Sequence, residues 1–513
     1  MEKDAQGEKD AVKRLLSATL EGIDAQPVEV EVSFIKGLPA FGIVGLGSTA
    51  IQESKERVKS ALNAAGFSFP PLKITVNLSP SDLQKSGSHF DLPIALAITL
   101  HDTPHETDDL YIFGELGLDG TLKESAALFP LLLSLANRGL LRRAMVPADA
   151  LARLSLIPDI TLIGVQNLTE AIAAAKGEYR PPHQNTATLP GKTITVGQKT
   201  YHYLDEYPED FAQVIGQERA KRAALIAAAG MHNLLMEGSP GCGKSMIARR
   251  LRYILPPMSR EEVLQATRYA LLGDENPNFR PLRPFRAPHH SASKPSIFGG
   301  GSTRARIGEV ALANGGILFF DEFPHFQKSV LEALREPLQD HRLLISRVNA
   351  KVSYETRFLF VAAQNPCPCG NLLSARRTCR CTELEIKRYK NRLSDPLLDR
   401  IELYVQMQES SESDRASLTS AQMHRQVIAA FCHRIARGQS TPNGKLNEKE
   451  IDRFCRLDDE AEETLSQAAG RFALSRRAVA NTKKVARTVA DLEEAEIITK
   501  SHILEALGYR RRA

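Results

Sequence analysis

The sequence lacks any apolar run long enough to cross a lipid bilayer. Its best candidates, residues 92–100 and 128–136, fall short of the roughly 18 residues that a membrane-spanning helix needs. The charged start Met1-Glu2-Lys3-Asp4 is not followed by the apolar segment of a secretory signal. These absences predict a cytoplasmic protein with no membrane partner.

The sequence also lacks a large excess of one charge sign or of cysteine. Its 513 residues are 42% hydrophobic and 25% charged, a globular composition with room for about three domains. The formal net charge of +5 is only a weak indication of a polyanionic partner. In a cytoplasmic protein, the seven cysteines are expected to bind metal or remain reduced rather than to form disulfides.

Changes in composition along the chain predict five segments. Residues 1–14 are dense in charge and form a tail, and residues 15–178 have the strand and helix patterns of an α+β domain. Proline, glycine and polar residues mark residues 179–208 as a linker. Strands alternate with helices over residues 209–406, which predicts a mostly parallel sheet, and residues 407–513 are helical in pattern.

Four elements can be placed within the N-terminal domain. Residues 28–32 alternate valine with glutamate, the period-two pattern of a half-buried strand, and residues 74–78 form another strand. Residues 50–65 have the pattern of an amphipathic helix, and residues 92–100 that of a buried helix.

A phosphate-binding loop follows a short apolar strand at residues 233–237. The loop has the complete pattern G-x-x-x-x-G-K-S and precedes a helical stretch at residues 246–255, the order that a P-loop needs. Its glycines let backbone N–H groups surround phosphate oxygens, and the helix N-terminus adds positive charge. Lys244 is expected to reach the β- and γ-phosphates of ATP, and Ser245 to bind Mg²⁺. The predicted nucleotide-binding residues are Gly238, Ser239, Pro240, Gly241, Cys242, Gly243, Lys244, Ser245 and Met246.

Two further apolar strands end in polar residues that complete this site. Residues 316–320 lead to Asp321 and Glu322, at the strand end where open α/β sheets bind ligands. Asp321 is expected to hold Mg²⁺ through water, and Glu322 to polarise the attacking water. Residues 357–364 lead to Asn365, a candidate for orienting that water; the alternative is a turn-forming asparagine before a proline.

Two arginines in the C-terminal half are candidates for contacting the γ-phosphate. Arg400 lies near the end of the strand and helix alternation and could be an arginine finger that reaches a neighbouring subunit's nucleotide. A lone arginine is more often part of a surface salt bridge. Arg477 opens a helix and could be a lid arginine that senses phosphate.

Four clustered cysteines have the pattern C-x-C-x₉-C-x-C. Four thiolates within such a short stretch predict a tetrahedral Zn²⁺ site, although the usual spacing is C-x₂-C. The alternative is a set of reduced thiols that brace the loop after Asn365. The four residues are Cys367, Cys369, Cys379 and Cys381.

Two segments are candidates for contact with nucleic acid. Two β-rich runs flank residues 348–350, a pattern that indicates a hairpin. Arg347 and Lys351 beside its tip could bind DNA phosphates, or they could be ordinary solvated charges. Residues 269–301 form a long insert rich in proline and glycine, with several arginines and two histidines, and are the second candidate.

With these motifs the chain carries further distinctive stretches, and residues 15–513 resemble the ComM/YifB family of magnesium-chelatase-like AAA+ proteins. The stretches are FGIVGL at 41–46, FDLPIALA at 90–97, RPFRAPHHS at 283–291, FGGG at 298–301, NPCPCG at 365–370 and VARTVADL at 485–492.

The resemblance implies an α/β architecture with three parts. These are an N-terminal Lon-protease-like domain of the ribosomal S5 domain 2 type, an AAA+ P-loop core and a C-terminal helical lid. It also implies a homohexameric ring with ATP and Mg²⁺ between subunits. Asn365 then occupies the sensor-1 position, Arg400 the finger position, and Arg477 the sensor-2 position, acting on a neighbour's site.

The resemblance further implies a DNA helicase that drives branch migration during homologous recombination in natural transformation. Its expected partners are single-stranded and branched duplex DNA and recombinase filaments. In related helicases, a hairpin at the position of residues 342–354 points into the pore of the ring. The competing hypothesis is a protein-remodelling ATPase, as in magnesium chelatase or Lon-type proteases.

A Lon-type protease needs a serine nucleophile activated by a lysine. His89 stands where the serine is expected, and Leu128-Phe129-Pro130 where the lysine is expected. The sequence therefore predicts no proteolysis, with Ser86 and Ser88 as the remaining candidates for a nucleophile.

Overall fold

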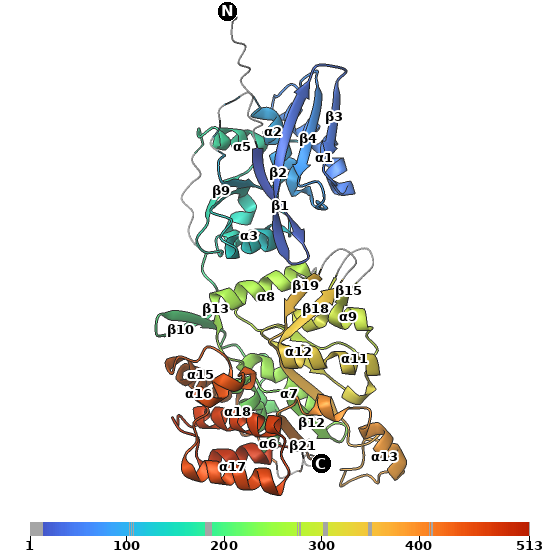
Figure 1. Cartoon of the computed structure of the whole chain (residues 1–513), viewed down its shortest axis with the longest axis vertical. Coiled ribbons are helices and arrows are strands. Elements are labelled where there is room, and N and C mark those ends of the chain that lie inside the picture. Colours follow the sequence, from blue (N-terminus) through green and yellow to red (C-terminus); the bar gives the residue numbers. More distant parts are fainter. Residues whose placement is uncertain are drawn as a thin grey trace, which may run out of the picture. The chain divides into compact units, whose positions relative to one another are not determined.

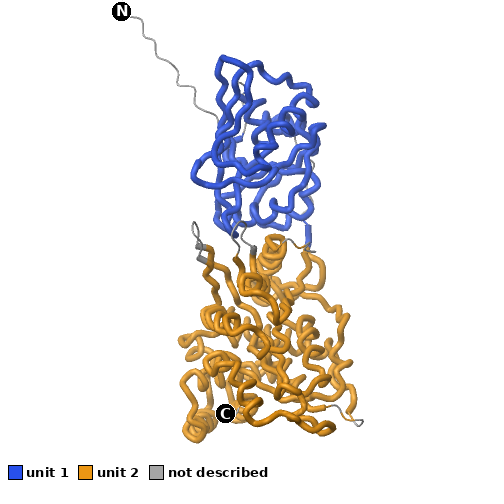
Figure 2. Tube along the Cα trace, turned by 90° about the vertical axis from the view of Figure 1, so that its right-hand side faces the viewer, with its two compact units in different colours: residues 1–188 blue, residues 189–513 orange. Residues whose placement is uncertain are grey.

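The structure of the chain is a computed structural model. It describes residues 14–101, 103, 105, 107–179, 187–273, 275, 279–300, 306–346, 351–409, 411 and 414–511. The chain divides into two compact units, residues 1–188 and 189–513 (Figure 2). Among the described residues, no helix is both long and apolar enough to span a membrane.

Unit 1 is built on a seven-stranded mixed sheet with the order β3-β4-β2-β1-β5-β8-β9. The strand β2 runs antiparallel to β1 and β4, whereas β5, β8 and β9 continue the sheet in parallel. The strands are β1 (Arg14–Glu21), β2 (Asp24–Ile35), β3 (Ala40–Val44), β4 (Lys73–Ser79), β5 (Leu110–Ile112), β6 (Glu115–Leu116), β7 (Leu122–Lys123), β8 (Arg143–Pro147) and β9 (Thr161–Val165). The helices are α1 (Thr49–Ala64), α2 (Asp91–Thr99), α3 (Leu128–Asn137), α4 (Leu151–Leu154) and α5 (Leu168–Ala175).

The sequence patterns of unit 1 match its elements. Val28, Val30 and Val32 of β2 are buried while the intervening glutamates stay partly exposed, which is the alternation that predicted this strand. The predicted strand at residues 74–78 lies within β4, and the two predicted helices are α1 and α2. The helix α2 is buried on nearly all sides, so its sequence is apolar throughout rather than amphipathic.

The boundary between the units corrects the predicted linker. The division after Thr188 falls inside residues 179–208, but β10 (Lys192–Val196) and β11 (Lys199–Tyr203) form an antiparallel hairpin in unit 2. The hairpin continues to β13 (Met258–Ser259). Its strands are rich in β-branched and aromatic residues, and its turn contains Gly197 at a φ of 62°. Local strand propensity therefore outweighs the linker composition.

The central sheet of unit 2 is parallel, as predicted. Its order is β14-β17-β20-β12-β21, and every neighbouring pair is parallel. The strands are β12 (Leu234–Gly238), β14 (Phe285–Arg286), β17 (Ile317–Phe320), β20 (Leu359–Gln364) and β21 (Leu403–Met407). Parallel strands place their carboxyl ends at one edge, so the residues that follow β12, β17 and β20 meet there.

Shorter elements surround this sheet. Two antiparallel pairs join β15 (Gly299–Gly300) to β16 (Arg306–Ile307), and β18 (Arg342–Ser346) to β19 (Lys351–Glu355). The helices of this region are α6 (Glu218–Gly230), α7 (Lys244–Leu251), α8 (Arg260–Leu272), α9 (Lys294–Phe298), α10 (Glu309–Leu312), α11 (Lys328–Ala333), α12 (Arg335–Asp340), α13 (Glu383–Lys390) and α14 (Asp395–Leu398).

The C-terminal part of unit 2 is helical, as its pattern predicts. Its helices are α15 (Ser420–Ala436), α16 (Glu448–Phe454), α17 (Asp459–Arg471), α18 (Arg476–Leu492) and α19 (Lys500–Gly508). They gather beside α6, against which α15 and α18 pack (Figure 1). Val427 and Val489 share one hydrophobic core with Ile226 and the sheet. The segments predicted as separate domains, 209–406 and 407–513, therefore form one compact unit.

Candidate active site

The P-loop lies between the buried strand β12 and the first turn of α7. Gly241 and Gly243 have φ values of 83° and 94°, which glycine adopts without strain and which turn the loop back towards the helix. Lys244 begins α7 and is almost fully buried. Its ammonium donates hydrogen bonds to the carbonyl oxygens of Gly238 at 2.6 Å and Ser239 at 3.0 Å. The lysine therefore lies inside the loop that surrounds the phosphates in P-loop proteins.

The residues predicted to hold Mg²⁺ come together in the structure. The Ser245 hydroxyl donates a hydrogen bond to Asp321 Oδ2 at 2.7 Å, although the two residues are far apart in sequence. Asp321 directly follows β17 and is exposed. Hydroxyl and carboxylate oxygens are hard ligands of the kind that Mg²⁺ prefers. The pair therefore fits a magnesium site beside the P-loop.

Glu322 is positioned by an unusual backbone and by a histidine. Its φ of 51° lies in the left-handed region, and its N–H donates to Asp321 Oδ1 at 3.0 Å. One of its carboxylate oxygens lies 3.3 Å from His290 Nδ1. The His290 ring is tilted against that of His289, with ring centroids 4.2 Å apart. The sequence predicts that both histidines lie in the insert that could contact nucleic acid. Only their position shortly after β14 could have indicated that His290 contacts Glu322.

Asn365 completes the group at the carboxyl edge of the sheet. It directly follows β20, and its Oδ1 accepts a hydrogen bond from the Lys244 ammonium at 3.2 Å. Tyr389 of α13 hydrogen-bonds to the Asn365 backbone, and burial raises the pKa of Tyr389 to about 12. The asparagine thus touches the P-loop lysine, which favours the water-orienting role over that of a simple turn residue.

A buried polar bridge lies directly behind the site. Gln364, the residue before Asn365, donates to Glu237 Oε2 at 2.5 Å, and Tyr404 donates to Glu237 Oε1 at 2.9 Å. Glu237 precedes the P-loop and pairs in register with Gln364 across β12 and β20. Both side chains are buried. The bridge fixes the P-loop strand against the strand that carries Asn365, and sequence reasoning missed it.

Arg400 lies at the opposite end of the sheet from Lys244. Its carbonyl oxygen accepts a hydrogen bond at 2.7 Å from the side chain of Asn233, the residue before β12. The P-loop begins at the other end of this five-residue strand, a rise of about 16 Å. Because an arginine side chain spans less than half of that distance, Arg400 cannot reach the nucleotide site of its own chain.

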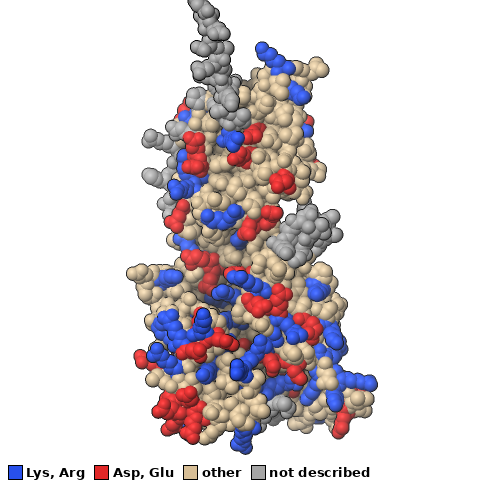
Figure 3. All heavy atoms as spheres, in the orientation of Figure 1, with Lys and Arg blue, Asp and Glu red and all other residues tan. Residues whose placement is uncertain are grey.

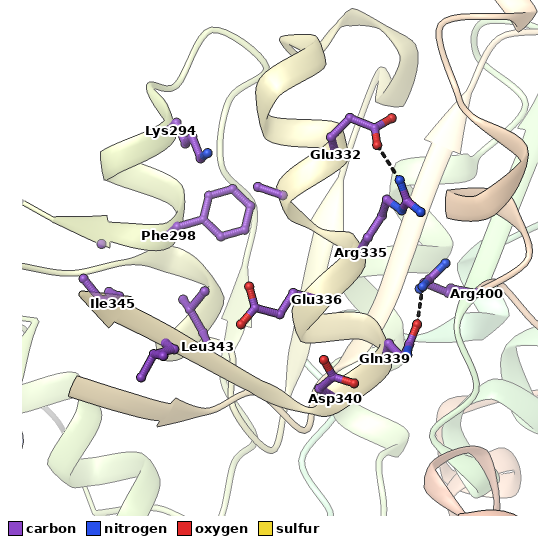
Figure 4. A pocket seen from close by; sticks show the side chains of 13 residues that line it. Lys294, Phe298, Glu332, Arg335, Glu336, Gln339, Asp340, Leu343, Ile345 and Arg400 are labelled. Atoms are coloured by element: carbon purple, nitrogen blue, oxygen red, sulfur yellow. Dashed lines mark hydrogen bonds and ion pairs between the residues drawn. The ribbon is translucent and has the colours of Figure 1, made fainter. Parts of the chain in front are cut away.

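Arg400 and Arg477 share one partner on a common surface. Both donate to Gln339 Oε1, Arg477 at 3.2 Å. Desolvation, with a smaller contribution from the nearby Arg477 and Arg335, lowers the pKa of Arg400. Arg400 and Arg335 border a cavity of about 630 Å³ that also includes Glu332 and residues of α9 and β18 (Figure 4). Arg400 and Arg477 therefore lie together on one surface, at the end of the sheet opposite the P-loop of their own chain.

The four cysteines of the C-x-C pairs converge on one point. Their sulfur atoms all lie within 4.8 Å of one another. Cys367 Sγ is 3.4 Å from Cys369 Sγ and 3.6 Å from Cys379 Sγ. A tetrahedron of sulfurs around Zn²⁺ has edges of about 3.8 Å, so the donor set fits this metal.

Comparison with known proteins places this site in a family. The family model "Magnesium chelatase, subunit ChlI" matches residues 210–415, "Subunit ChlI of Mg-chelatase" matches 28–150, and "Magnesium chelatase, subunit ChlI C-terminal" matches 417–510. Competence protein ComM of Haemophilus influenzae is 39% identical over 95% of both chains. The protein YifB of Escherichia coli is 37% identical over 95% of both. Rv2897c of Mycobacterium tuberculosis is 36% identical over 98% of this chain and 99% of its own.

The chain belongs to the ComM/YifB family. Membership in this magnesium-chelatase-like AAA+ family implies ATPase activity with ATP and Mg²⁺. The residues that the sequence predicts for ATP hydrolysis, from Lys244 to Asn365, are grouped at one edge of the sheet.

The ComM/YifB insert at residues 269–301 uses its arginines within the fold. Arg283 is buried and bonded to Glu262 and to backbone carbonyls, so this arginine of the insert serves the fold. Arg286 pairs with Glu275 and Glu309, and Arg280 pairs with Glu206. These ion pairs brace α8, β14 and α10 around the sheet.

The predicted hairpin around residues 348–350 is present as β18 and β19, paired from Arg342–Glu355 to Ser346–Lys351. Arg347 lies outside the described residues, and Lys351 is the first residue of β19. Over the face of unit 2 in Figure 3, described Lys and Arg side chains are interspersed with Asp and Glu. Charge on that face alone therefore does not mark a path for DNA.

In unit 1, the position expected for a protease serine is structural. His89 is buried, and its Nε2 lies 2.9 Å from the carbonyl oxygen of Ala18. Burial lowers the pKa of His89 to about 4. The Ser88 hydroxyl donates to Glu115 rather than to a lysine, while the Lys85 amine donates to the Pro80 carbonyl.

Proposed function

We propose that the chain is an ATP-dependent DNA helicase or translocase that promotes branch migration during homologous recombination. The proposal rests on membership in a family with a relative named as a competence protein. The observation that carries it is the separation of the nucleotide site into two halves. Lys244 lies at one end of β12, and Arg400 at the other. Such a chain needs a neighbour to complete each site, as a ring-forming motor does.

ATP hydrolysis follows from the grouped residues. Lys244 would bind the β- and γ-phosphates from within the loop, and Ser245 with Asp321 would hold a magnesium ion. Bound there, magnesium would supply positive charge next to the phosphate oxygens. Glu322 accepts a proton from the attacking water, and Asn365 orients that water from beside the lysine.

The ring is proposed to be a hexamer with heterologous contacts. In such a ring each subunit offers its P-loop on one side and its arginine surface on the other. Arg400 is the finger that stabilises the transferred phosphoryl group of a neighbour, and Arg477 acts on the same neighbouring site because both arginines share Gln339.

DNA is proposed to contact two hairpins of unit 2. Gly299 of β15 and Leu343 of β18 border the same cavity, so the two hairpins lie beside each other. Arg347 and Lys351 belong to the β18–β19 hairpin and are the proposed phosphate contacts. Single-stranded and branched DNA, and the recombinase filaments that form on them, are the proposed partners.

Two further assignments belong to this proposal. Unit 1 is a Lon-protease-like domain without a protease dyad, and α15–α19 form the lid of the AAA+ core. Cys367, Cys369, Cys379 and Cys381 bind one Zn²⁺ ion, because four sulfur donors lie at the separations that a tetrahedral site requires. Metal analysis of chelator-washed protein tests the zinc site: about one zinc per chain supports it, and less than half refutes it.

A DNA-dependent ATPase assay tests the proposed function. ATP hydrolysis is measured with and without single-stranded DNA, at two salt concentrations, with Lys244→Ala as the inactive control. Stimulation that weakens with salt supports a DNA motor. If DNA neither binds nor stimulates, the protein-remodelling alternative of the magnesium-chelatase or Lon type replaces it.

A further inference from the structure

The loop that carries the four cysteines lies against the P-loop. It begins at Cys367, two residues after Asn365, and reaches Gly370 by a turn in which the Gly370 N–H donates to the Cys367 carbonyl at 3.0 Å. Gly370 is buried. A Cβ placed on it would lie 2.7 Å from the Cδ and Cγ atoms of Pro240, the third residue of the P-loop. The close approach therefore leaves no space for a side chain between the two loops.

The same loop has little buried surface. None of residues 371–381 is buried, and Leu372 and Leu373 remain exposed. A side-chain hydrogen bond from Ser374 to Glu409 at 2.6 Å ties the middle of the loop to the region after β21. A loop with so little buried apolar surface gains little stability from packing. The cysteine cluster would therefore add a cross-link between the two ends of the loop.

The far end of the loop leads back to the catalytic group. Thr382 follows the last cysteine and caps α13 through a capping box with Glu385. Tyr389, on the same helix, is buried and bonded to the backbone of Asn365. A cross-link between the two C-x-C pairs therefore closes residues 367–381 into a ring that touches Pro240 through Gly370. The helix that follows this ring, α13, touches Asn365 through Tyr389.

We infer that Zn²⁺ in the cysteine cluster holds this loop against the P-loop, so that bound metal sets the affinity of the chain for ATP. The inference rests on the proposed ATP and zinc sites. Coupling between two ligands is reciprocal: if zinc strengthens ATP binding by some factor, ATP strengthens zinc binding by the same factor. Couplings of this kind range over about 5- to 150-fold in affinity.

The test measures both affinities on the full-length protein. A fluorescent ATP analogue is titrated into zinc-loaded wild type and into Cys379→Ser/Cys381→Ser, which removes two metal ligands that lie outside the P-loop sequence. Thiol-blocking reagents are avoided because Cys242 lies in the P-loop. The inference predicts that loss of zinc weakens analogue binding by about fivefold or more, and that ATP strengthens zinc retention of wild type by a similar factor.

Gly370→Ala is the second variant, because it leaves all four cysteines in place. Its methyl group would meet Pro240, so it should weaken ATP binding while zinc content stays at one per chain. Gly438→Ala is the matched control. Gly438 has a φ of 77° and Gly370 a φ of 79°, so alanine strains the backbone equally at both positions. At Gly438, however, no atom lies within 4 Å of the added Cβ. The control should bind ATP and zinc as the wild type does.

The outcomes separate the inference from the proposed function. If the wild type binds zinc but its loss changes the affinity for ATP by less than twofold, the inference is overturned and the zinc site is supported. A chain without zinc that binds ATP normally overturns the zinc site and the inference, and leaves the ATPase intact. A zinc-loaded chain that binds no ATP overturns the proposed ATPase itself.

Discussion

Replacing Arg400 by alanine is expected to inactivate a uniform ring and yet permit rescue by a second inactive variant. Arg400 sits at the amino end of β12, about 16 Å from the P-loop of its own chain, and in the proposed ring it serves the site of a neighbour. Removal of an arginine finger lowers the rate of hydrolysis by about 10³- to 10⁵-fold. Arg400→Ala alone should therefore have almost no ATPase activity, while its affinity for ATP falls little.

Mixing this variant with Lys244→Ala gives a quantitative result. A site works only where a subunit with an intact P-loop meets a neighbour with an intact Arg400. In an equal mixture that assembles at random, each of these conditions holds for half of the subunits, so about one quarter of the sites are restored. This fraction does not depend on the number of subunits in the ring. The assay is steady-state phosphate release after the two variants are mixed and allowed to exchange subunits.

Arg477 provides the control for this experiment. Because Arg400 and Arg477 share Gln339, both would face the same neighbour in the proposed ring. An equal mixture of Arg400→Ala and Arg477→Ala should stay inactive, since every neighbour lacks one of the two. Recovery in that mixture would place Arg477 in its own chain's site. Normal ATPase activity of Arg400→Ala would refute the site shared between subunits. So would a mixture of Arg400→Ala and Lys244→Ala that recovers no activity although its subunits are shown to exchange.

Four further predictions follow from contacts around the site and in unit 1. Glu322→Gln should bind ATP normally but hydrolyse it about 10²- to 10⁴-fold more slowly, as measured by nucleotide binding and phosphate release. His290→Ala should lower kcat about ten- to a hundredfold with little change in KM, because the 3.3 Å contact positions the Glu322 carboxylate; equal kcat would disprove this role. Gln364→Leu should lower the free energy of unfolding by about 1–3 kcal/mol, because buried Glu237 loses a partner, and urea titration measures the change. His89 binds a proton below about pH 6.5 in the unfolded chain but only below about 4 in the folded chain. The free energy of unfolding should therefore rise with pH between these values, by about 1.4 kcal/mol per pH unit from this residue. Urea titrations of His89→Gln at pH 5 and 7 should lack this contribution.

The parts of the site that the sequence could predict are those encoded locally. The P-loop needs a strand, a glycine-rich turn and a helix in direct succession, and all three are contiguous between residues 234 and 251. Asp321 and Asn365 could be added because each ends an apolar strand, and parallel strands share one edge. The same rule places Ser245 and Asp321 at one edge of the sheet, where the structure joins them by a hydrogen bond.

The parts that could not be predicted depend on pairing between distant strands or on competing local signals. Gln364 meets Glu237 only because β12 and β20 pair in one register, which no local pattern specifies. The His290 contact with Glu322 depends on the path of the chain after β14. The prolines and glycines around the β10–β11 hairpin favour a linker, whereas Gly197 and the β-branched residues on either side of it favour a hairpin. The structure shows that the hairpin pattern prevails.

The central claim, that ATP hydrolysis at a site shared between subunits moves DNA, is tested most directly by branch migration of a labelled four-way junction. Wild type, Glu322→Gln and Arg400→Ala are compared with ATP and Mg²⁺ on junctions with homologous arms. The account predicts that only the wild type, and the mixture of Arg400→Ala with Lys244→Ala to a reduced extent, converts the junction into separated duplexes. Full ATPase activity without any conversion of the junction, and without stimulation by DNA, would contradict it.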